Sequence, residues 1–164
     1  MTSRQHHPIP PLYDAGSRIL ILGSFPSVKS RQAAFFYAHP QNRFWKTVSG
    51  VLGCACPTDV EEKKQMLHSH HIALWDTIAS CDIEGSSDSS IRNVVPNDLS
   101  CILNAAQIRA VFCNGAASHA LYCRYILPLS GQEAIRLPST SPANAACSLS
   151  ELQRQWQAIL PYLQ

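Results

Sequence analysis

The chain has 164 residues, of which 46% are hydrophobic and 15% charged, and its formal net charge is +2. This composition is typical of one compact domain and excludes a disordered chain. The weak positive charge permits a nucleic-acid partner without indicating one. No apolar run approaches the ~18 residues of a membrane span, and the first residues lack a secretory signal pattern. Seven cysteines, an odd number, predict reduced thiols and a cytoplasmic protein.

Short apolar runs alternate with helical patterns along the chain. Residues 1–16, rich in proline, predict an irregular lead-in. The runs at 18–23, 71–75, 109–113 and 133–137 predict strands that are buried on both faces. Apolar periodicity and capping residues predict helices over 42–52, 59–69, 97–106, 115–127 and 148–160, with Asn97 as the N-cap of the third. The serine-rich stretch 85–90 predicts a loop.

Strands that alternate with helices indicate a parallel α/β architecture. We therefore expect a single domain over 1–164, folded as a three-layer α/β/α sandwich around a central, mainly parallel, four-stranded sheet. Such sheets bind ligands beyond the carboxyl ends of their strands. The segments expected there, which should form one cleft, are Gly23-Ser-Phe-Pro-Ser27, Asp76-Thr77, Asn114-Gly115 and Leu137-Pro-Ser-Thr-Ser-Pro-Ala-Asn144.

Several of these segments match known motifs. Gly23-Ser-Phe-Pro-Ser27 followed by Tyr37-Ala-His-Pro-Gln-Asn-Arg-Phe-Trp45 resembles the paired first motif of mismatch-specific uracil glycosylases. The stretch 137–144 resembles their second motif, a loop that enters the DNA minor groove. Together with 73–77 and 86–91, it looks most like the hypoxanthine-DNA (deoxyinosine) glycosylase branch of the uracil-DNA glycosylase superfamily. The resemblance covers about 18–156.

The resemblance implies a monofunctional DNA glycosylase. Such an enzyme hydrolyses the N-glycosidic bond of a deaminated base that has been flipped out of DNA, and hypoxanthine is the base expected here. The partner is damaged DNA. No cofactor, metal or obligate protein partner is implied, and relatives in this superfamily are monomers.

Asn42 is the expected catalytic residue. Most branches carry an Asp or Asn before the proline of the first motif, where it activates water, but this chain has Phe25. The same Phe is characteristic of the hypoxanthine branch, in which a downstream Asn that matches Asn42 takes over. An amide can hold water through one donor and one acceptor without titrating. The alternative is that Asn42 only caps the helix that follows.

The same resemblance suggests how the flipped base is held. Tyr37 matches an aromatic residue that stacks on the base, with a core tyrosine as the alternative. His39 is expected to assist catalysis by donating to the base or to a phosphate, unless it only fixes the His-Pro turn. Backbone N–H groups around Gly23, Ser24 and Phe25 are expected to hold a base oxygen as it gains negative charge.

Asp76 matches the position at which uracil glycosylases use Asn to read the base edge. A carboxylate accepts hydrogen bonds but donates none. It should accept the N1–H of hypoxanthine and reject adenine, whose N1 is an acceptor. The alternative is an N-cap or a salt bridge.

DNA-backbone contacts are expected around the same cleft. Ser139, Thr140 and Ser141 would contact phosphates, and Pro142 and Ala143 would form a small wedge. These contacts fix register without reading sequence. Pro26, Ser27 and Asn114 complete the expected DNA-binding set. Asn114 is included because it opens a helix, with a simple strand-to-helix turn as the alternative.

Other functions remain open from the sequence. Uracil also presents a ring N–H, so a uracil or G/T(U)-mismatch glycosylase is the nearest alternative. A non-catalytic nucleic-acid-binding domain of the same fold would have no need of Asn42. A metal site built from Cys54, Cys56 and the histidines of 68–71 lacks a standard ligand spacing. A thiol enzyme would pair Cys113 or Cys123 with His119.

Overall fold

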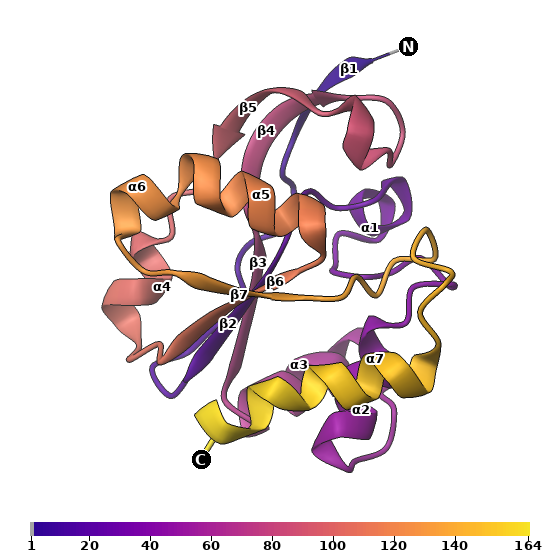
Figure 1. The fold of residues 1–164 in the computed structure, drawn as a ribbon, viewed down its shortest axis with the longest axis vertical. Coiled ribbons are helices and arrows are strands. Elements are labelled where there is room, and N and C mark those ends of the chain that lie inside the picture. Colours follow the sequence, from indigo (N-terminus) through magenta and orange to yellow (C-terminus); the bar gives the residue numbers. More distant parts are fainter. Residues whose placement is uncertain (1) are drawn as a thin grey trace.

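A four-stranded parallel sheet forms the centre of the computed structural model, which describes residues 2–164 (Figure 1). Its strands lie in the order β3-β2-β6-β7. They are β2 (Ile19–Gly23), β3 (Ile72–Asp76), β6 (Ala110–Asn114) and β7 (Ala134–Leu137). The four predicted apolar runs therefore lie within one residue of the observed strands, and the predicted three-layer α/β/α fold class is confirmed.

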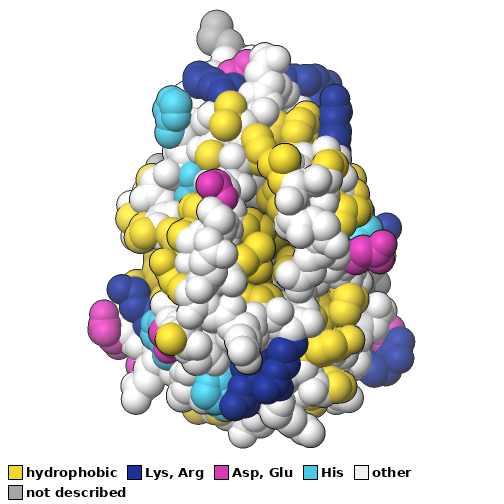
Figure 2. All heavy atoms as spheres, turned by 90° about the vertical axis from the view of Figure 1, so that its left-hand side faces the viewer, with side chains coloured by type: hydrophobic (Ala, Val, Ile, Leu, Met, Phe, Trp, Pro, Cys, Tyr) yellow, Lys and Arg dark blue, Asp and Glu magenta, His cyan; other side chains and the backbone are white. Residues whose placement is uncertain are grey.

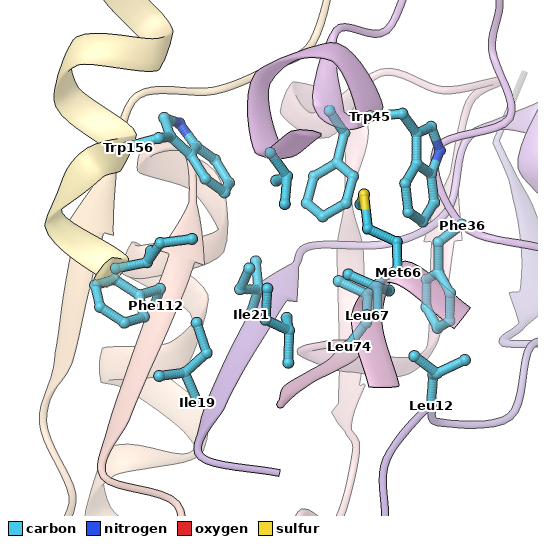
Figure 3. Packing of buried hydrophobic residues seen from close by; sticks show 14 of the residues in the cluster. Leu12, Ile19, Ile21, Phe36, Trp45, Met66, Leu67, Leu74, Phe112 and Trp156 are labelled. Carbon is cyan, nitrogen blue, oxygen red and sulfur yellow. The ribbon is translucent and has the colours of Figure 1, made fainter. Parts of the chain in front are cut away.

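Helices cover both faces of this sheet because its strands bury side chains in both directions. Ile19 and Ile21 face one core, which is closed by α2 (Phe44–Leu52), α3 (Val60–Ser69) and α7 (Leu149–Trp156) (Figure 3). Leu20 and Leu22 face the other. That core is closed by α4 (Ser100–Ala105), α5 (Ala116–Tyr125) and α6 (Leu127–Ser130) (Figure 1). Two-sided burial explains the continuous apolar runs of β2, β3 and β6. The prediction of two-sided burial was wrong for β7, an edge strand in which Ile135 and Arg136 are exposed.

A second, antiparallel sheet lies beside the first and was not predicted. It has the order β1-β4-β5 and comprises β1 (Ser3–His6), β4 (Ile78–Ile83) and β5 (Arg92–Pro96). The prediction of an irregular lead-in over 1–16 was thus wrong for β1. Because β1 is an edge strand with largely exposed side chains, it carries no apolar alternation that the sequence could reveal.

The helices differ from the prediction mainly at their ends. The helix expected over 115–127 continues after Ile126 as the short α6, and the one expected over 148–160 ends as a 3-10 turn over Gln157–Tyr162. The helix α1 (Val28–Ala33) was not predicted. Short 3-10 structure over Asp88–Ser90 interrupts the predicted serine-rich loop.

Asn97 is not the N-cap of α4, which was the sequence-based interpretation. Its buried side chain donates instead to the carbonyl oxygens of Asp76 at 2.8 Å and Ile78 at 3.1 Å. The Asp98 carboxylate accepts from the Ser100 backbone N–H at 2.9 Å. Asn97 therefore fixes the crossing from β3 into β4, beside the cleft described below.

None of the helices within residues 2–164 is both long and apolar enough to cross a bilayer. On the face shown in Figure 2, hydrophobic side chains lie between ridges of polar groups, whereas Lys and Arg lie mostly towards its upper and lower ends. Positive charge on this face is therefore dispersed and forms no stripe.

Candidate active site

A cavity of about 340 Å³ opens at the carboxyl ends of the parallel strands. Every residue that the sequence predicted for the site lines it, and so do Ser30, Phe36, Ser86 and Asp88. The lining residues from the sequence prediction are Gly23, Ser24, Phe25, Pro26, Ser27, Tyr37, His39, Asn42, Asp76, Asn114, Ser139, Thr140, Ser141, Pro142 and Ala143. The fold thus brings the five separate segments that hold these residues to one cleft.

Asn42 lies in the turn before α2, and its side-chain oxygen is fully engaged. Oδ1 accepts from the Phe44 backbone N–H at 2.9 Å and from the Thr140 hydroxyl at 2.9 Å. Because a backbone N–H needs an acceptor, these bonds fix which end of the amide is the oxygen. Nδ2 makes no hydrogen bond to the described residues and is left to the cleft. The side chain therefore closes the turn before α2 through Oδ1, and only its Nδ2 donor remains free for another partner.

Thr140 connects Asn42 to the end of β6. Its hydroxyl accepts from Asn114 Nδ2 at 3.0 Å, and its backbone N–H donates to Asn114 Oδ1 at 3.0 Å. The Thr140 residue is fully buried. Its hydroxyl is therefore an internal link in this structure, and the phosphate contacts expected of Ser139, Thr140 and Ser141 stay predictions.

Arg43, which the sequence reasoning missed, holds the loop that follows β7. Its guanidinium donates to the carbonyl oxygens of Cys147, Ser141 and Asn144, the last at 3.0 Å. Its backbone N–H donates to Thr140 O at 3.0 Å. One side chain thereby satisfies three carbonyls of a loop that has no regular secondary structure. A single Arg inside a motif carries no signal of such a role.

His39 is held through one ring nitrogen. Nδ1 accepts from the Gln41 backbone N–H at 3.1 Å, which fixes the turn after Pro40. The proton of the neutral ring is consequently on Nε2. Nε2 makes no hydrogen bond to residues 2–164, so a donor remains available at the cleft.

Tyr37 combines a stacked ring with a buried, unpaired hydroxyl. Its ring stacks on Phe44 with a centroid distance of 4.1 Å and an interplanar angle of 12°. Its backbone has φ 51°, in the left-handed region. The hydroxyl has no partner among the described residues. Burial, together with the charge of Asp76, raises the pKa of Tyr37 above its ordinary value, so the phenol stays protonated.

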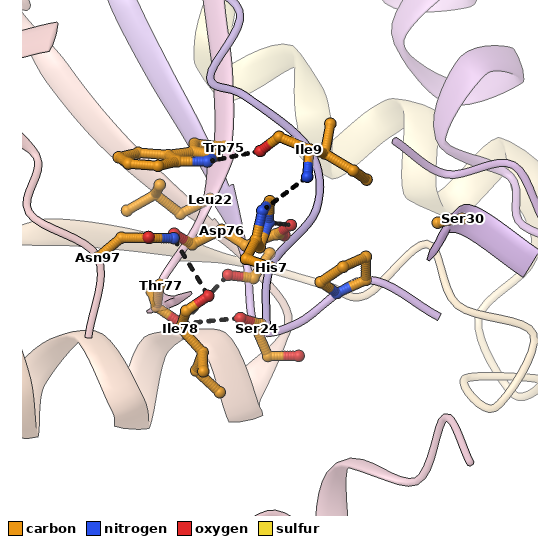
Figure 4. Close-up of polar contacts among 12 residues, drawn as sticks. His7, Ile9, Leu22, Ser24, Ser30, Trp75, Asp76, Thr77, Ile78 and Asn97 are labelled. Carbon is orange, nitrogen blue, oxygen red and sulfur yellow. Dashed lines mark hydrogen bonds and ion pairs between the residues drawn. The ribbon is translucent and has the colours of Figure 1, made fainter. Parts of the chain in front are cut away.

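Asp76 is buried at the end of β3 and is paired with His7 (Figure 4). His7 Nε2 lies 2.7 Å from Asp76 Oδ2, and the two side chains are 4% and 5% exposed. His7 Nδ1 accepts from the Ile9 backbone N–H at 3.3 Å, so Nε2 carries the proton and donates to the carboxylate. Sequence reasoning missed His7 because it lies in the segment interpreted as irregular.

The second oxygen of Asp76 occupies space that only a glycine leaves free. A Cβ on Gly23 would lie 2.4 Å from Asp76 Oδ1 and 3.1 Å from the Tyr37 hydroxyl. Oδ1 makes no hydrogen bond to any described residue. An unpaired carboxylate oxygen therefore lies at the floor of the cleft.

The turn after β2 presents backbone donors. The carbonyl oxygens of Gly23 and Ser24 accept hydrogen bonds from Thr77 and Ile78, which clamp this turn. The N–H groups of Ser24 and Phe25 donate to no acceptor within residues 2–164. Phe25 itself is buried, with its ring edge-on to His7, and cannot bind water.

One rim of the cleft is acidic. Ser24 Oγ donates to Asp88 Oδ1 at 2.8 Å, and Ser86 Oγ accepts from the Val28 backbone N–H at 2.9 Å. Although part of Asp88 meets solvent, partial burial of its carboxyl group and then the charge of Asp76 raise the pKa of Asp88 above its ordinary value. Neither Lys nor Arg is among the lining residues.

The competing thiol interpretation does not fit the geometry. Burial raises the pKa of Cys113 to about 12, so its thiol stays protonated. Cys123 Sγ lies 3.7 Å from His119 Nε2, but the same nitrogen lies 3.3 Å from Ala134 O and donates to that carbonyl. His119 therefore cannot serve as a base for the thiol through this nitrogen. Within residues 2–164, no three His, Cys, Asp or Glu side chains are grouped to hold a metal ion.

Known proteins are similar in sequence to this chain over almost its whole length. The family model of the uracil DNA glycosylase superfamily matches residues 10–164. A protein named hypoxanthine DNA glycosylase from Methanosarcina acetivorans is 32% identical over 151 residues, which is 92% of this chain and 94% of that protein. Its namesake from Methanosarcina barkeri is 31% identical over 149 residues, 90% of this chain and 92% of that one.

Solved structures agree with the sequence relatives. The solution NMR structure of a Methanosarcina acetivorans protein superposes with a TM-score of 0.82 at 32% identity, covering 96% of this chain and 98% of that one. The sequence relatives and the solved structure thus match the chain over almost its whole length. The chain belongs to the uracil-DNA glycosylase superfamily.

Proposed function

We propose that this chain is a monofunctional DNA glycosylase that removes hypoxanthine from deoxyinosine in DNA. The observation that carries the proposal is the pairing of groups at the cleft floor. Asp76 Oδ1 is an unpaired acceptor, and the N–H groups of Ser24 and Phe25 are unpaired donors. Hypoxanthine presents a donor, N1–H, next to an acceptor, O6, so the two edges are complementary.

Adenine presents the reverse pattern and is disfavoured by the same groups. Its N1 is an acceptor and would face the Asp76 carboxylate, and its 6-amino group would face the backbone donors. Either mismatch leaves a desolvated polar group unpaired, which costs about 1–3 kcal/mol or more for a charged group. Uracil shares an N–H beside a carbonyl, so uracil is the alternative substrate.

The proposed reaction breaks the bond between C1′ and N9, and its electron pair leaves with the base. Negative charge then develops towards O6, where the N–H groups of Ser24 and Phe25 stabilise it. The sugar becomes oxocarbenium-like, and a water held by Asn42 Nδ2 adds to C1′ and loses its proton to solvent. His39 Nε2–H supplies a further donor to the base or a flanking phosphate. A Schiff base plays no part in this route, since the lining residues include no lysine.

Base stacking and DNA binding complete the proposal. Tyr37, with Phe44 behind its ring, supports the flipped base. Ser139 and Ser141 contact the phosphates beside the lesion, with Pro26, Ser27 and Asn114 nearby. Pro142 and Ala143, both exposed, fill the space that the base vacates. We expect the protein to act as a cytoplasmic monomer on damaged DNA; its seven cysteines are all free.

The test is a panel of single-lesion duplexes containing inosine, uracil, xanthine, ethenocytosine or mismatched thymine, followed by alkaline cleavage. The wild-type chain should release hypoxanthine fastest. Asp76→Asn should reduce inosine excision and raise the ratio of uracil to inosine excision, because an amide offers a donor as well as an acceptor. A wild-type enzyme that removes uracil readily and leaves inosine intact would show that the uracil alternative is correct.

A further inference from the structure

The N-terminal strand reaches the base-recognition floor through one side chain. His7 directly follows β1, and its backbone N–H donates to Ala79 O at 2.8 Å in β4. The ring then passes under the cleft, edge-on to Phe25 at 5.9 Å and to Trp75 at 6.2 Å. Packing on two aromatic rings leaves the imidazole little freedom to turn.

Both ring nitrogens of His7 are assigned by their partners. Nδ1 accepts from the Ile9 N–H, and Nε2–H donates to Asp76 Oδ2 at 2.7 Å (Figure 4). The imidazole thus acts on Asp76 as a donor. An imidazolium would place a second proton on Nδ1 against the Ile9 N–H, so this arrangement fits a neutral ring and an ionised carboxylate.

The hydrogen bond from His7 also determines which carboxylate oxygen of Asp76 faces the cleft. With Oδ2 engaged, Oδ1 is directed over the α-carbon of Gly23 and has no partner among the described residues. A buried carboxylate without its donor would turn to find another hydrogen bond or take up a proton, since an unpaired buried charge is costly. A protonated carboxyl group would present a donor to the base.

We infer that His7 is a positioning residue for base recognition: it holds Asp76 ionised and turned so that Oδ1 alone accepts the N1–H of the flipped base. This inference rests on the proposed function, in which Asp76 reads the base. His7 does not touch the base, and its contribution acts entirely through Asp76.

The experiment is single-turnover excision of hypoxanthine by His7→Leu, which removes the donor, and by His7→Gln, which keeps one. His7→Leu should lose roughly tenfold to hundredfold in rate, the size typical when a residue that orients a liganding side chain is removed. His7→Gln should stay within about threefold of wild type. His6→Leu is the matched control, because His6 is the neighbouring, exposed residue of the same strand.

Two further measurements separate positioning from a merely structural role. Affinity for a duplex with an abasic-site analogue should be unchanged in His7→Leu, because that DNA has no base to read. In an Asp76→Asn background, His7→Leu should cause no further loss, since a residue that acts through Asp76 is silent without it. If the rate losses of His7→Leu and Asp76→Asn multiply in the double variant instead, the inference is overturned.

The outcomes for the inference and for the proposed function are distinct. If wild type releases no hypoxanthine, the proposed function fails and the inference fails with it. If wild type is active and His7→Leu keeps its full rate, only the inference fails. Should His7→Leu not fold, His7→Gln decides: retained activity supports the inference, and a folded Gln variant as slow as Asp76→Asn overturns it.

Discussion

Three polar side chains of the cleft each use one atom for a hydrogen bond within the protein and have a second atom without a partner among the described residues. They are Asn42, His39 and Asp76. Asn42 is held through Oδ1, His39 through Nδ1 and Asp76 through Oδ2. The atom that is held fixes the rotamer, so the free atom is placed before any substrate arrives. Such preorganisation removes the reorganisation cost that a mobile side chain would add to the reaction barrier.

Asn42→Ala should lower single-turnover excision by roughly 10²–10⁴-fold, typical for a lost catalytic group, while affinity for inosine DNA falls much less. Asn42→Ser is the matched control, because serine still accepts from the Phe44 N–H as a cap but offers no amide donor. It should therefore fold as stably as wild type and remain slow. An Asn42→Ser enzyme with full activity would show that capping is the only role.

Asp88 gives a prediction about stability and pH. The folded state raises its pKa above the ordinary value of 3.8, so the folded chain binds this proton more tightly than the unfolded chain does. Stability therefore falls as pH rises from about 3.8 through the raised pKa. Asp88→Asn should melt at a higher temperature than wild type at pH 7, and the difference should shrink below pH ~3.8.

Asp82 is a control for Asp88, because its pKa shifts in the opposite direction on folding. A hydrogen bond from Asn93, followed by one from Arg4, lowers the pKa of Asp82 below 3.8. Asp82→Asn should therefore destabilise the chain at neutral pH, and the loss should disappear as pH falls through the lowered pKa. Thermal melts of Asp88→Asn and Asp82→Asn across pH test both predictions. If both variants change the melting temperature at pH 7 in the same direction, the prediction is wrong.

At the scale of elements, the loop after β7 separates into a buried link and an exposed wedge. Thr140 connects Asn42 to Asn114, whereas Pro142 and Ala143 lie on the surface. Arg43 holds the whole loop against the start of α2. In the proposed function, DNA entry and bond cleavage would thus be served by neighbouring residues of one loop.

Replacing Ser139, Ser141, Pro142 and Ala143 with glycine should weaken excision from stable duplexes most. Single-stranded substrate needs no unpairing and should suffer least. Thr140→Val is the comparison, because it removes the hydroxyl that donates to Asn42 Oδ1 and should slow both substrates equally. Single-turnover rates on matched single- and double-stranded inosine substrates measure this. Equal losses in the glycine variant would place those residues in the bond-breaking step.

The elements that the sequence predicted are those whose burial determines their residue pattern. The parallel strands β2, β3 and β6 are buried along almost their whole length, so their apolar runs are unambiguous. By contrast, β5 has no buried residue and α1 has only six residues, so neither produces a readable apolar period. The cleft residues were found because the motifs lie at strand ends. His7 and Arg43 do not lie at strand ends, so this position could not reveal them. His7 contacts Asp76, 69 residues away, and Arg43 contacts carbonyls at least 98 residues away.

At the scale of the whole molecule, the charge distribution predicts a weak dependence of DNA binding on salt. The net charge is only +2, and the lining residues include Asp76 and Asp88 but neither Lys nor Arg. Hydroxyl and backbone contacts to phosphates release few counterions. The slope of log affinity against log salt should therefore be shallower than about −3.

Fluorescence anisotropy with abasic-analogue duplex, titrated across about 50–200 mM salt, measures that slope. Lys29→Ala is the informative variant, because Lys29 is exposed at the start of α1, close to the cleft. If Lys29 contacts a phosphate, its loss should reduce the slope by about one. A wild-type slope as steep as about −6 would point to a basic surface outside the cleft.

The missing side chain at position 23 restricts how this cleft can change by mutation. A methyl group there would lie 2.4 Å from Asp76 Oδ1 and 3.1 Å from the Tyr37 hydroxyl. A side chain at residue 23 therefore requires Asp76 to move or change. A shorter residue at 76 removes the closer contact and leaves only the approach to Tyr37. Any mutational route to a new base preference through this floor must alter position 76 first, so the order of steps, as well as their sum, determines which specificities descendants of this chain can reach.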